Sequence, residues 1–261
     1  MDVNPLKSIW DSGDAAVGTA LFYSRDSTTV QLAAAAGLDF VLFDLEHRPY
    51  SYETVHDLSQ TARNAGMASL VGPRDISDHA ISHVLDIGAS GVVVPHVQTL
   101  EEVELAINSV RYPPIGRRGR TGVAGHNLYA PSRSQAEEID HYNSDVALLL
   151  KVESESAIAG LDGLVAPDGV DGVMVGPLDL SLDIGVPGQM SHPRVLELID
   201  HVRKVCRARN VQYGTIVASA DEVSEAIEGG ATWVVAGSDM GFLSEAWTRA
   251  GCAKSSSNPN K

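Results

Sequence analysis

Two short apolar runs each end on a carboxylate, namely Val146-Ala-Leu-Leu-Leu-Lys-Val-Glu153 and Gly172-Val-Met-Val-Gly-Pro-Leu-Asp179. Twenty-six residues separate Glu153 from Asp179, which is about the length of one strand–helix–strand unit. Because parallel strands end at the same edge of a sheet, we expect both carboxylates at one rim. A carboxylate in that place packs poorly, but it can hold a divalent cation where a substrate reaches it.

Apolar runs of this kind recur eight times, with amphipathic helical patterns between most of them. They cover residues 17–22, 40–43, 68–71, 91–94, 146–152, 172–175, 213–217 and 233–236. This alternation predicts an α/β fold, the (β/α)₈ TIM barrel, in which chemistry occurs at the carboxyl ends of the strands. We expect residues 1–253 to form this single domain and the Ser-rich, polar segment 254–261 to be a disordered tail.

Composition narrows the classes of function. Hydrophobic residues make up 44% of the 261 residues, and the formal net charge is −15. Such acidity disfavours nucleic acids and anionic membranes as partners, because both attract basic surfaces. The sequence also lacks a signal-peptide pattern, an apolar stretch long enough for a bilayer and a disulfide framework. We therefore expect a cytoplasmic enzyme.

Two further residues suit acid–base chemistry. His47 closely follows the run 40–43, where a histidine can act as a general base, although a lone histidine more often has a structural role. Asp86 lies between apolar residues and needs a partner, for which a histidine ring is suited. His96, directly after Pro95, is also placed to line a site at the rim. The alternative interpretation of Glu153 and Asp179, in place of a metal site, is that both are solvated acids at the surface.

Lys151 shares one face of its strand with Glu153. Inside a barrel, such a lysine can form a Schiff base with a ketone, or it can neutralise nearby acids, which we favour. Residues 111–145 contain no predicted strand, and a loop of this length is typical of a functional segment or a subunit contact. Arg118 and Arg120 in this loop suit an anion or a second chain.

Taken in order, these segments resemble the HpcH/HpaI aldolase family, the metal-dependent pyruvate aldolases typified by 4-hydroxy-2-oxoheptanedioate aldolase. The likeness is carried by Phe43-Asp-Leu-Glu-His47, Val84-Leu-Asp-Ile-Gly-Ala89, Val94-Pro-His-Val97, Arg111-Tyr-Pro-Pro-Ile-Gly-Arg-Arg-Gly119, Val152-Glu-Ser154 and Gly169-Val-Asp-Gly-Val-Met-Val-Gly-Pro-Leu-Asp-Leu-Ser181. It implies a (β/α)₈ barrel of the phosphoenolpyruvate/pyruvate-binding type, assembled as a homohexamer.

The resemblance also implies roles for individual residues. Glu153 and Asp179 look like the ligands of Mg²⁺ or Mn²⁺, with Co²⁺ as a further option. His47 and Asp86 look like an acid–base dyad that works through a water molecule. The strip whose backbone faces the pyruvate carboxylate looks like Gly176, Pro177 and Leu178.

The sequence departs from the family pattern at three positions. Where relatives carry an arginine that steadies the pyruvyl oxygen, this chain has Gly72, and Arg74 stands two residues later. Leu178 replaces a small residue, and Lys151 replaces a neutral one. We predict that Arg74 reaches back to serve in catalysis and that Leu178 narrows the pocket for the aldehyde.

Together these features predict a divalent-metal-dependent carbon–carbon lyase. It would reversibly cleave a 4-hydroxy-2-oxo acid, a small-molecule substrate, to pyruvate and an aldehyde. One alternative is a relative that decarboxylates oxaloacetate or forms a carbon–carbon bond in a secondary pathway. The others are a Schiff-base aldolase built on Lys151 and a catalytically silent barrel that serves as a binding subunit.

Overall fold

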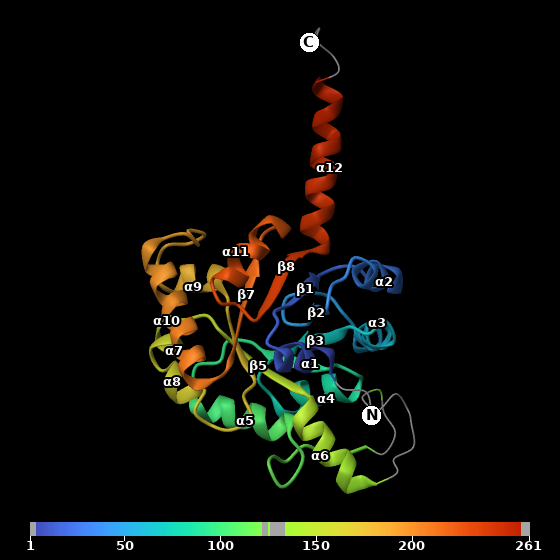
Figure 1. The fold of residues 1–261 in the computed structure, drawn as a ribbon, viewed down its shortest axis with the longest axis vertical. Coiled ribbons are helices and arrows are strands. Elements are labelled where there is room, and N and C mark those ends of the chain that lie inside the picture. Colours follow the sequence, from blue (N-terminus) through green and yellow to red (C-terminus); the bar gives the residue numbers. More distant parts are fainter. Residues whose placement is uncertain (1–3, 122–124, 126–133, 257–261) are drawn as a thin grey trace.

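The computed structural model describes residues 4–121, 125 and 134–256. Its eight parallel strands close into one barrel in the order β1 to β8 (Figure 1). The strands are β1 (Ala16–Leu21), β2 (Phe40–Asp44), β3 (Ala68–Gly72), β4 (Gly91–Val94), β5 (Ala147–Val152), β6 (Gly172–Val175), β7 (Gln212–Val217) and β8 (Trp233–Ser238). This arrangement confirms the predicted (β/α)₈ barrel.

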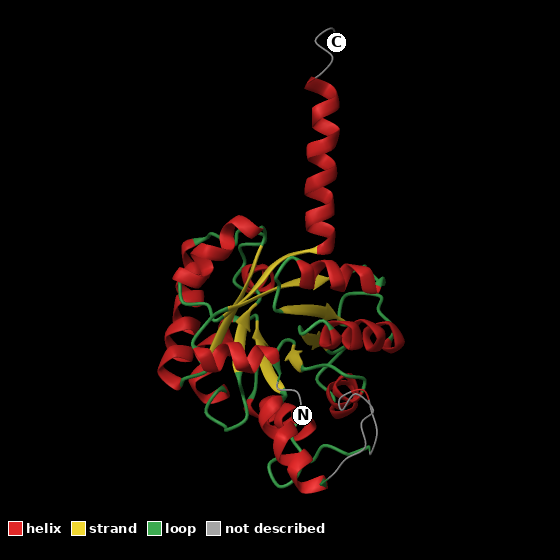
Figure 2. Ribbon diagram, turned by 45° about the vertical axis from the view of Figure 1, so that its right-hand side comes forward, coloured by secondary structure: helices red, strands yellow, loops and turns green. Residues whose placement is uncertain are grey.

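Most helices surround the barrel on its outer side, as Figure 2 shows, whereas α1 lies at one end and α12 projects away. The helices are α1 (Pro5–Ser12), α2 (Ser27–Ala35), α3 (Tyr52–Asn64), α4 (Asp78–Asp86), α5 (Leu100–Val110), α6 (Gln135–Asp145), α7 (Glu155–Ala159), α8 (Leu161–Leu164), α9 (Pro177–Asp183), α10 (Pro193–Arg209), the 3₁₀ turn η2 (Ala220–Glu222), α11 (Val223–Glu228) and α12 (Asp239–Ser256). Helices between consecutive strands return the chain to the edge where the strands begin. All the strands therefore end at one rim.

Alternate residues of the strands form two separate apolar cores. Inward-pointing side chains such as Phe40, Leu149 and Trp233 fill the barrel. Their neighbours, among them Val41 and Leu148, pack beneath the helices. Because side chains fill the interior, reactive groups are confined to the ends of the barrel.

Helix α1 closes the end of the barrel where the strands begin. Its Leu6 and Trp10 are buried and belong to the inner core. Its Lys7 forms an ion pair with Asp171, which also accepts a hydrogen bond from Arg111 Nη2 at 2.7 Å. These contacts close the end of the barrel at which the strands begin, here called the lower end. The rim formed by the carboxyl ends of the strands is therefore the open end.

The segment 111–145 was expected to be a long loop without a strand. Its described residues contain no strand, but they do contain helix α6, whose N-cap is the Ser134 side chain. Arg118 Nη2 lies 2.7 Å from Asp86 Oδ1, and Arg120 forms an ion pair with Glu138. Both arginines therefore contact acids of their own chain.

Helix α12 leaves the barrel at the open rim. It is tied there by Asp239, whose carboxylate accepts hydrogen bonds from the N–H groups of Phe22 (3.0 Å), Tyr23 (3.1 Å) and Ser24 (2.8 Å). Beyond this anchor, every residue from Met240 to Cys252 is exposed. Figures 1 and 2 show α12 projecting away from all other elements. The apolar side chains of Met240, Leu243 and Trp247 are therefore largely open to solvent in the described part of the chain.

The predicted tail overlaps the end of α12. The tail predicted at 254–261 begins within the last turn of α12, and residues 257–261 lie outside the described residues. Its disorder and the domain boundary at residue 253 therefore stay predictions.

Among the helices of the described ranges, none combines the length and the apolar character that a bilayer crossing requires.

Cys206 gives a first test of the packing on the outer side of the barrel. It is buried on α10, and burial raises the pKa of its thiol to about 12. In a Cys252→Ser variant, we expect an aromatic disulfide reagent to leave the folded protein unmodified, because the thiolate is the reactive form. Titration after unfolding in guanidinium should then reveal the thiol. Full reaction of the folded variant would contradict the buried placement.

Candidate active site

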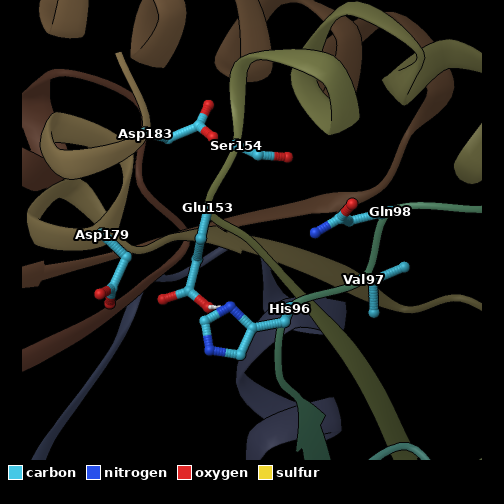
Figure 3. A pocket seen from close by; sticks show the side chains of 7 residues that line it. All are labelled: His96, Val97, Gln98, Glu153, Ser154, Asp179 and Asp183. Carbon is cyan, nitrogen blue, oxygen red and sulfur yellow. Dashed lines mark ion pairs between the residues drawn. The ribbon is translucent and has the colours of Figure 1, made fainter. Parts of the chain in front are cut away.

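The two carboxylates predicted at one rim line the same pocket. Glu153 follows β5 and Asp179 lies in the first turn of α9. Figure 3 shows their carboxylates facing a shared space. The other lining residues are His96, Val97, Gln98, Ser154 and Asp183. The structure thus brings the two proposed metal ligands together.

Glu153 is a buried carboxylate without aligned hydrogen-bond partners. Its side chain is 2% exposed, and neither of its oxygens has a well-aligned hydrogen bond from the described residues. Lys151 Nζ lies 2.6 Å from Oε1, and His96 Nδ1 lies 2.9 Å from Oε2. The nearby ammonium of Lys151 and the ring of His96 therefore compensate the charge of the Glu153 carboxylate, although neither contact has the geometry of a hydrogen bond. Buried oxygens in this state suit a hard divalent cation.

Burial is the main influence on the protonation of Glu153. Removal from water raises the pKa of Glu153, whereas Lys151 and, after it, His96 act to lower the pKa. The nearby Asp179 acts in the same direction as burial and raises the pKa of Glu153 further. Two carboxyl groups that share one space repel each other when both are ionised, and a cation between them removes that repulsion. The donor set of Glu153 and Asp179 therefore fits Mg²⁺ or Mn²⁺.

Gly176 makes room for the Glu153 carboxylate. A Cβ atom on Gly176 would lie 2.2 Å from Glu153 Oε1. The Gly176 N–H already donates to the Val152 carbonyl at 3.2 Å, and Pro177 has no N–H. In the strip predicted to face pyruvate, Leu178 therefore retains the N–H without a helical partner. The Leu178 side chain is 53% exposed and lies outside the pocket lining.

His96 joins two carboxylates across the rim. Its Nδ1 lies 2.9 Å from Glu153 Oε2, and its Nε2 lies 2.9 Å from Glu46 Oε1. Its φ of 50° is a left-handed backbone conformation, which is rare for residues other than glycine and concentrated at functional sites. The sequence indicated His96 only by its place after Pro95, and it did not single out Glu46.

Glu46, His47 and His96 form a second group of possible metal ligands. One donor atom from each lies within 4.8 Å of the others, and His47 Nε2 is 3.4 Å from Glu46 Oε2. Asp44 shapes the turn that presents them, because its carboxylate accepts the N–H groups of Glu46 at 2.8 Å and His47 at 3.1 Å. Since His96 also contacts Glu153, the two groups form one continuous site.

The expected dyad of His47 and Asp86 does not form within one chain. His47 follows β2 at the open rim, whereas Asp86 ends α4 at the opposite edge of the barrel. There its Oδ1 accepts a hydrogen bond from Arg118 Nη2 at 2.7 Å. The residue pattern indicated that each side chain needs a partner, but it did not reveal which end of the barrel each occupies. Within the described part of one chain, His47 and Asp86 therefore lie at opposite ends of the barrel.

Arg74 does not point into the pocket. Its Nη2 donates to the Tyr50 carbonyl at 3.3 Å, and its guanidinium lies 5.1 Å from the centroid of the Tyr52 ring. The strand ends at Gly72, so the alternation that would return residue 74 to the barrel interior stops before it. The expected replacement of the missing arginine by Arg74 is therefore not seen.

Lys151 is charged in this environment. Burial disfavours the ammonium, but Glu153 foremost, with Glu46 and Asp179, outweighs burial and raises the pKa of Lys151. The contacts agree with the predicted neutralising role. They disfavour a nucleophilic amine, which has to lose its proton before it attacks a ketone.

Comparison with known proteins identifies the family of this chain. The family model described as HpcH/HpaI aldolase/citrate lyase matches residues 20–246. The chain belongs to this family. The membership confirms the resemblance seen in the sequence motifs and the prediction of a carbon–carbon lyase.

Individual relatives cover nearly the whole chain. A 2-keto-3-deoxy-L-rhamnonate aldolase of Salmonella paratyphi B is 32% identical, covering 93% of this chain and 90% of the relative. The crystal structure of an HpcH/HpaI aldolase from Desulfitobacterium hafniense is 31% identical, with a TM-score of 0.93 and 99% of both chains covered. The crystal structure of the citrate synthase SbnG is 25% identical, with a TM-score of 0.86, covering 98% of this chain and 99% of the other.

Substitution of Gly176 tests whether Glu153 is held in a geometry that binds metal. We expect Gly176→Ala to weaken Mn²⁺ binding at least about tenfold, because the new methyl group displaces the carboxylate. Titration calorimetry of the chelator-treated protein measures the dissociation constant. The control is Gly163→Ala on α8, where an added Cβ meets nothing within 4 Å. Equal affinities of the two variants would argue against this role of Gly176.

Proposed function

We propose that this chain is a divalent-metal-dependent aldolase that reversibly cleaves a 4-hydroxy-2-oxo acid into pyruvate and an aldehyde. The observation that carries the proposal is the buried Glu153 carboxylate, which lies in a pocket shared with Asp179 and has no aligned partner among the described residues. The relative from Salmonella paratyphi B is named for a 2-keto acid substrate, which supports the same substrate class here. The net charge of −15 disfavours nucleic-acid partners. A cytoplasmic location is part of the proposal.

Glu153 and Asp179 are the metal ligands in this proposal, with Mg²⁺ or Mn²⁺ as the preferred ions and Co²⁺ as a further option. When bound, the cation supplies a Lewis acid that draws electron density from the keto group of the substrate. Glu46, which also pairs with His96, offers an alternative ligand. Leu178 contributes the backbone N–H for the substrate carboxylate.

His47 is the proposed base for the hydroxyl proton of the substrate. It stands at the open rim, half exposed, with Nε2 directed toward Glu46. From there it accepts the proton of the C4 hydroxyl through a water molecule. The C3–C4 bond then breaks, its electron pair passes to C3, and C4 becomes the carbonyl carbon of the aldehyde. Protonation of C3 completes pyruvate.

Removal of metal tests the proposal directly. We expect EDTA to abolish pyruvate release from 4-hydroxy-2-oxo acids and Mn²⁺ or Mg²⁺ to restore it. Glu153→Gln and Asp179→Asn should each lower kcat/KM by at least about a hundredfold. Glu197→Gln, an exposed carboxylate on α10, is the control. Full activity after chelation, with borohydride trapping of pyruvate on Lys151, would favour the Schiff-base alternative instead.

A second candidate reaction uses oxaloacetate as the 2-oxo acid. The structural similarity to SbnG supports a second candidate, because the name of that protein, citrate synthase, describes a reaction other than the cleavage of a 4-hydroxy-2-oxo acid. Decarboxylation of oxaloacetate and cleavage of a 4-hydroxy-2-oxo acid both leave a pyruvate enolate, so the same carboxylates serve both reactions. Parallel assays of pyruvate release from the two substrate classes distinguish them.

We also propose that the protein works as a homo-oligomer, a hexamer according to the family resemblance. Helix α12 exposes Met240, Phe242, Leu243 and Trp247, and Trp247 is 68% exposed. Of these, Met240, Leu243 and Trp247 recur at helical spacing, and exposed apolar side chains in such a row indicate a contact with another protein surface. A second copy of the chain is the occupant that we propose. In such an assembly, Asp86 of one copy can approach His47 of another.

The α12 contact is tested by its most exposed side chain. We expect Trp247→Glu to lower the molar mass measured by light scattering, because a charge replaces apolar area at the contact. Lys204→Gln, exposed on α10, should leave the molar mass unchanged. A Trp247→Glu protein with the molar mass of the wild type would speak against α12 as the contact surface.

A further inference from the structure

Lys151 continues the inward-facing row of β5. The two residues below it in this row, Ala147 and Leu149, belong to the inner core. The Lys151 side chain is only 22% exposed, and Nζ lies 2.6 Å from Glu153 Oε1. Lysine side chains normally carry the ammonium out to water, so a lysine kept inside the barrel mouth is an unusual arrangement.

Two inner rows of the barrel end on a glycine at the same rim as Lys151. The inner row of β3 ends at Gly72, where a Cβ atom would have no neighbour nearer than 3.7 Å. The inner row of β6 ends at Gly176, and Glu153 fills the room that this glycine leaves. No side chain therefore extends from Gly72 into the barrel mouth, which Lys151 enters from β5.

Other cations of the rim are engaged elsewhere. Arg74 lies over the Tyr52 ring, and the Arg48 guanidinium lies 4.2 Å from the centroid of the Phe22 ring. Arg25 donates to a backbone carbonyl at 2.8 Å. In the described part of the chain, Lys151 is thus the one lysine or arginine that forms an ion pair with a carboxylate of the pocket.

The proposed reaction increases negative charge at this place. A 4-hydroxy-2-oxo acid enters as a monoanion, whereas the enolate of pyruvate is a dianion once the hydroxyl proton has gone to the base. A cation that is already fixed beside the reacting atoms stabilises the dianion more than the monoanion. It therefore lowers the barrier and does not merely tighten substrate binding.

We propose that Lys151 is a catalytic residue whose ammonium contacts the 2-oxo acid and stabilises the enolate formed when the C3–C4 bond breaks. This inference rests on the aldolase function proposed above. The bond's electron pair passes to C3 and the keto oxygen, the aldehyde leaves, and a proton added at C3 yields pyruvate. Lys151 keeps its own protons throughout, so it forms no covalent bond.

The same charge has a second consequence. Lys151 pairs with the carboxylate that is proposed to hold the divalent cation. A cation held by Glu153 and Asp179 would compete with this ion pair and leave the Lys151 ammonium free to contact the substrate. Like charges repel over these short distances, so Lys151 weakens the hold of Glu153 and Asp179 on the metal. A residue that merely supported Glu153 would have the opposite effect on metal affinity.

The test compares full-length Lys151→Gln and Lys151→Arg with a matched control, Lys7→Gln. Lys7 pairs with Asp171 at the closed end of the barrel, and its side chain is 18% exposed, so the control removes a comparable ion pair far from the pocket. Calorimetry gives the dissociation constant of Mn²⁺ on chelator-treated protein. At saturating Mg²⁺, it also gives those of oxalate, a dianion like the enolate, and of pyruvate, a monoanion.

We expect Lys151→Gln to bind Mn²⁺ about tenfold more tightly than the wild type. The same variant should lose about tenfold of the preference for oxalate over pyruvate and about a hundredfold in kcat at saturating metal. Lys151→Arg should recover most of the preference for oxalate, and Lys7→Gln should match the wild type throughout.

Two results would overturn the role of Lys151. One is an unchanged oxalate-to-pyruvate preference in Lys151→Gln. The other is weaker Mn²⁺ binding by that variant, which would make Lys151 a support for Glu153. Failure of the wild type itself to bind Mn²⁺ would instead refute the proposed metal-dependent function, and this inference with it.

Discussion

The Glu153 carboxylate is buried at the mouth of the barrel, where no donor among the residues that the structure describes is aligned with its oxygens. A charge in such a place is tolerated only when other charges lie close by, because water no longer screens it. The neighbouring features of the rim serve this requirement. Gly176 leaves space for the carboxylate, Lys151 supplies a cation from the same strand, and His96 adopts a left-handed backbone to reach it.

The sequence was sufficient for features that depend on one element at a time. The alternation of apolar runs and helical patterns predicted the barrel, and the position of Glu153 and Asp179 just beyond strand ends predicted their shared rim. Neither inference needs knowledge of side-chain torsions. The ionic partner of Lys151 was also expected, because residues two apart on a strand share a face.

Features that depend on the relation between elements were harder to predict. Asp86 lies at the far edge of the barrel from His47, since a helix between parallel strands ends where the next strand begins. Arg74 turns to the Tyr52 ring because the strand stops at Gly72. Glu46 and His96 meet through loop geometry and one positive φ angle, which no apolar pattern encodes.

The closure of one barrel end by α1 bears on the order of events in the proposed reaction. With Leu6 and Trp10 packed under the inner core, the barrel offers no passage at the end where the strands begin. If Glu153 and Asp179 anchor the 2-oxo acid as proposed, its aldehyde half would extend away from that anchor toward the open rim. The aldehyde would then leave before pyruvate. The closed lower end would in this way set the order in which the two products depart.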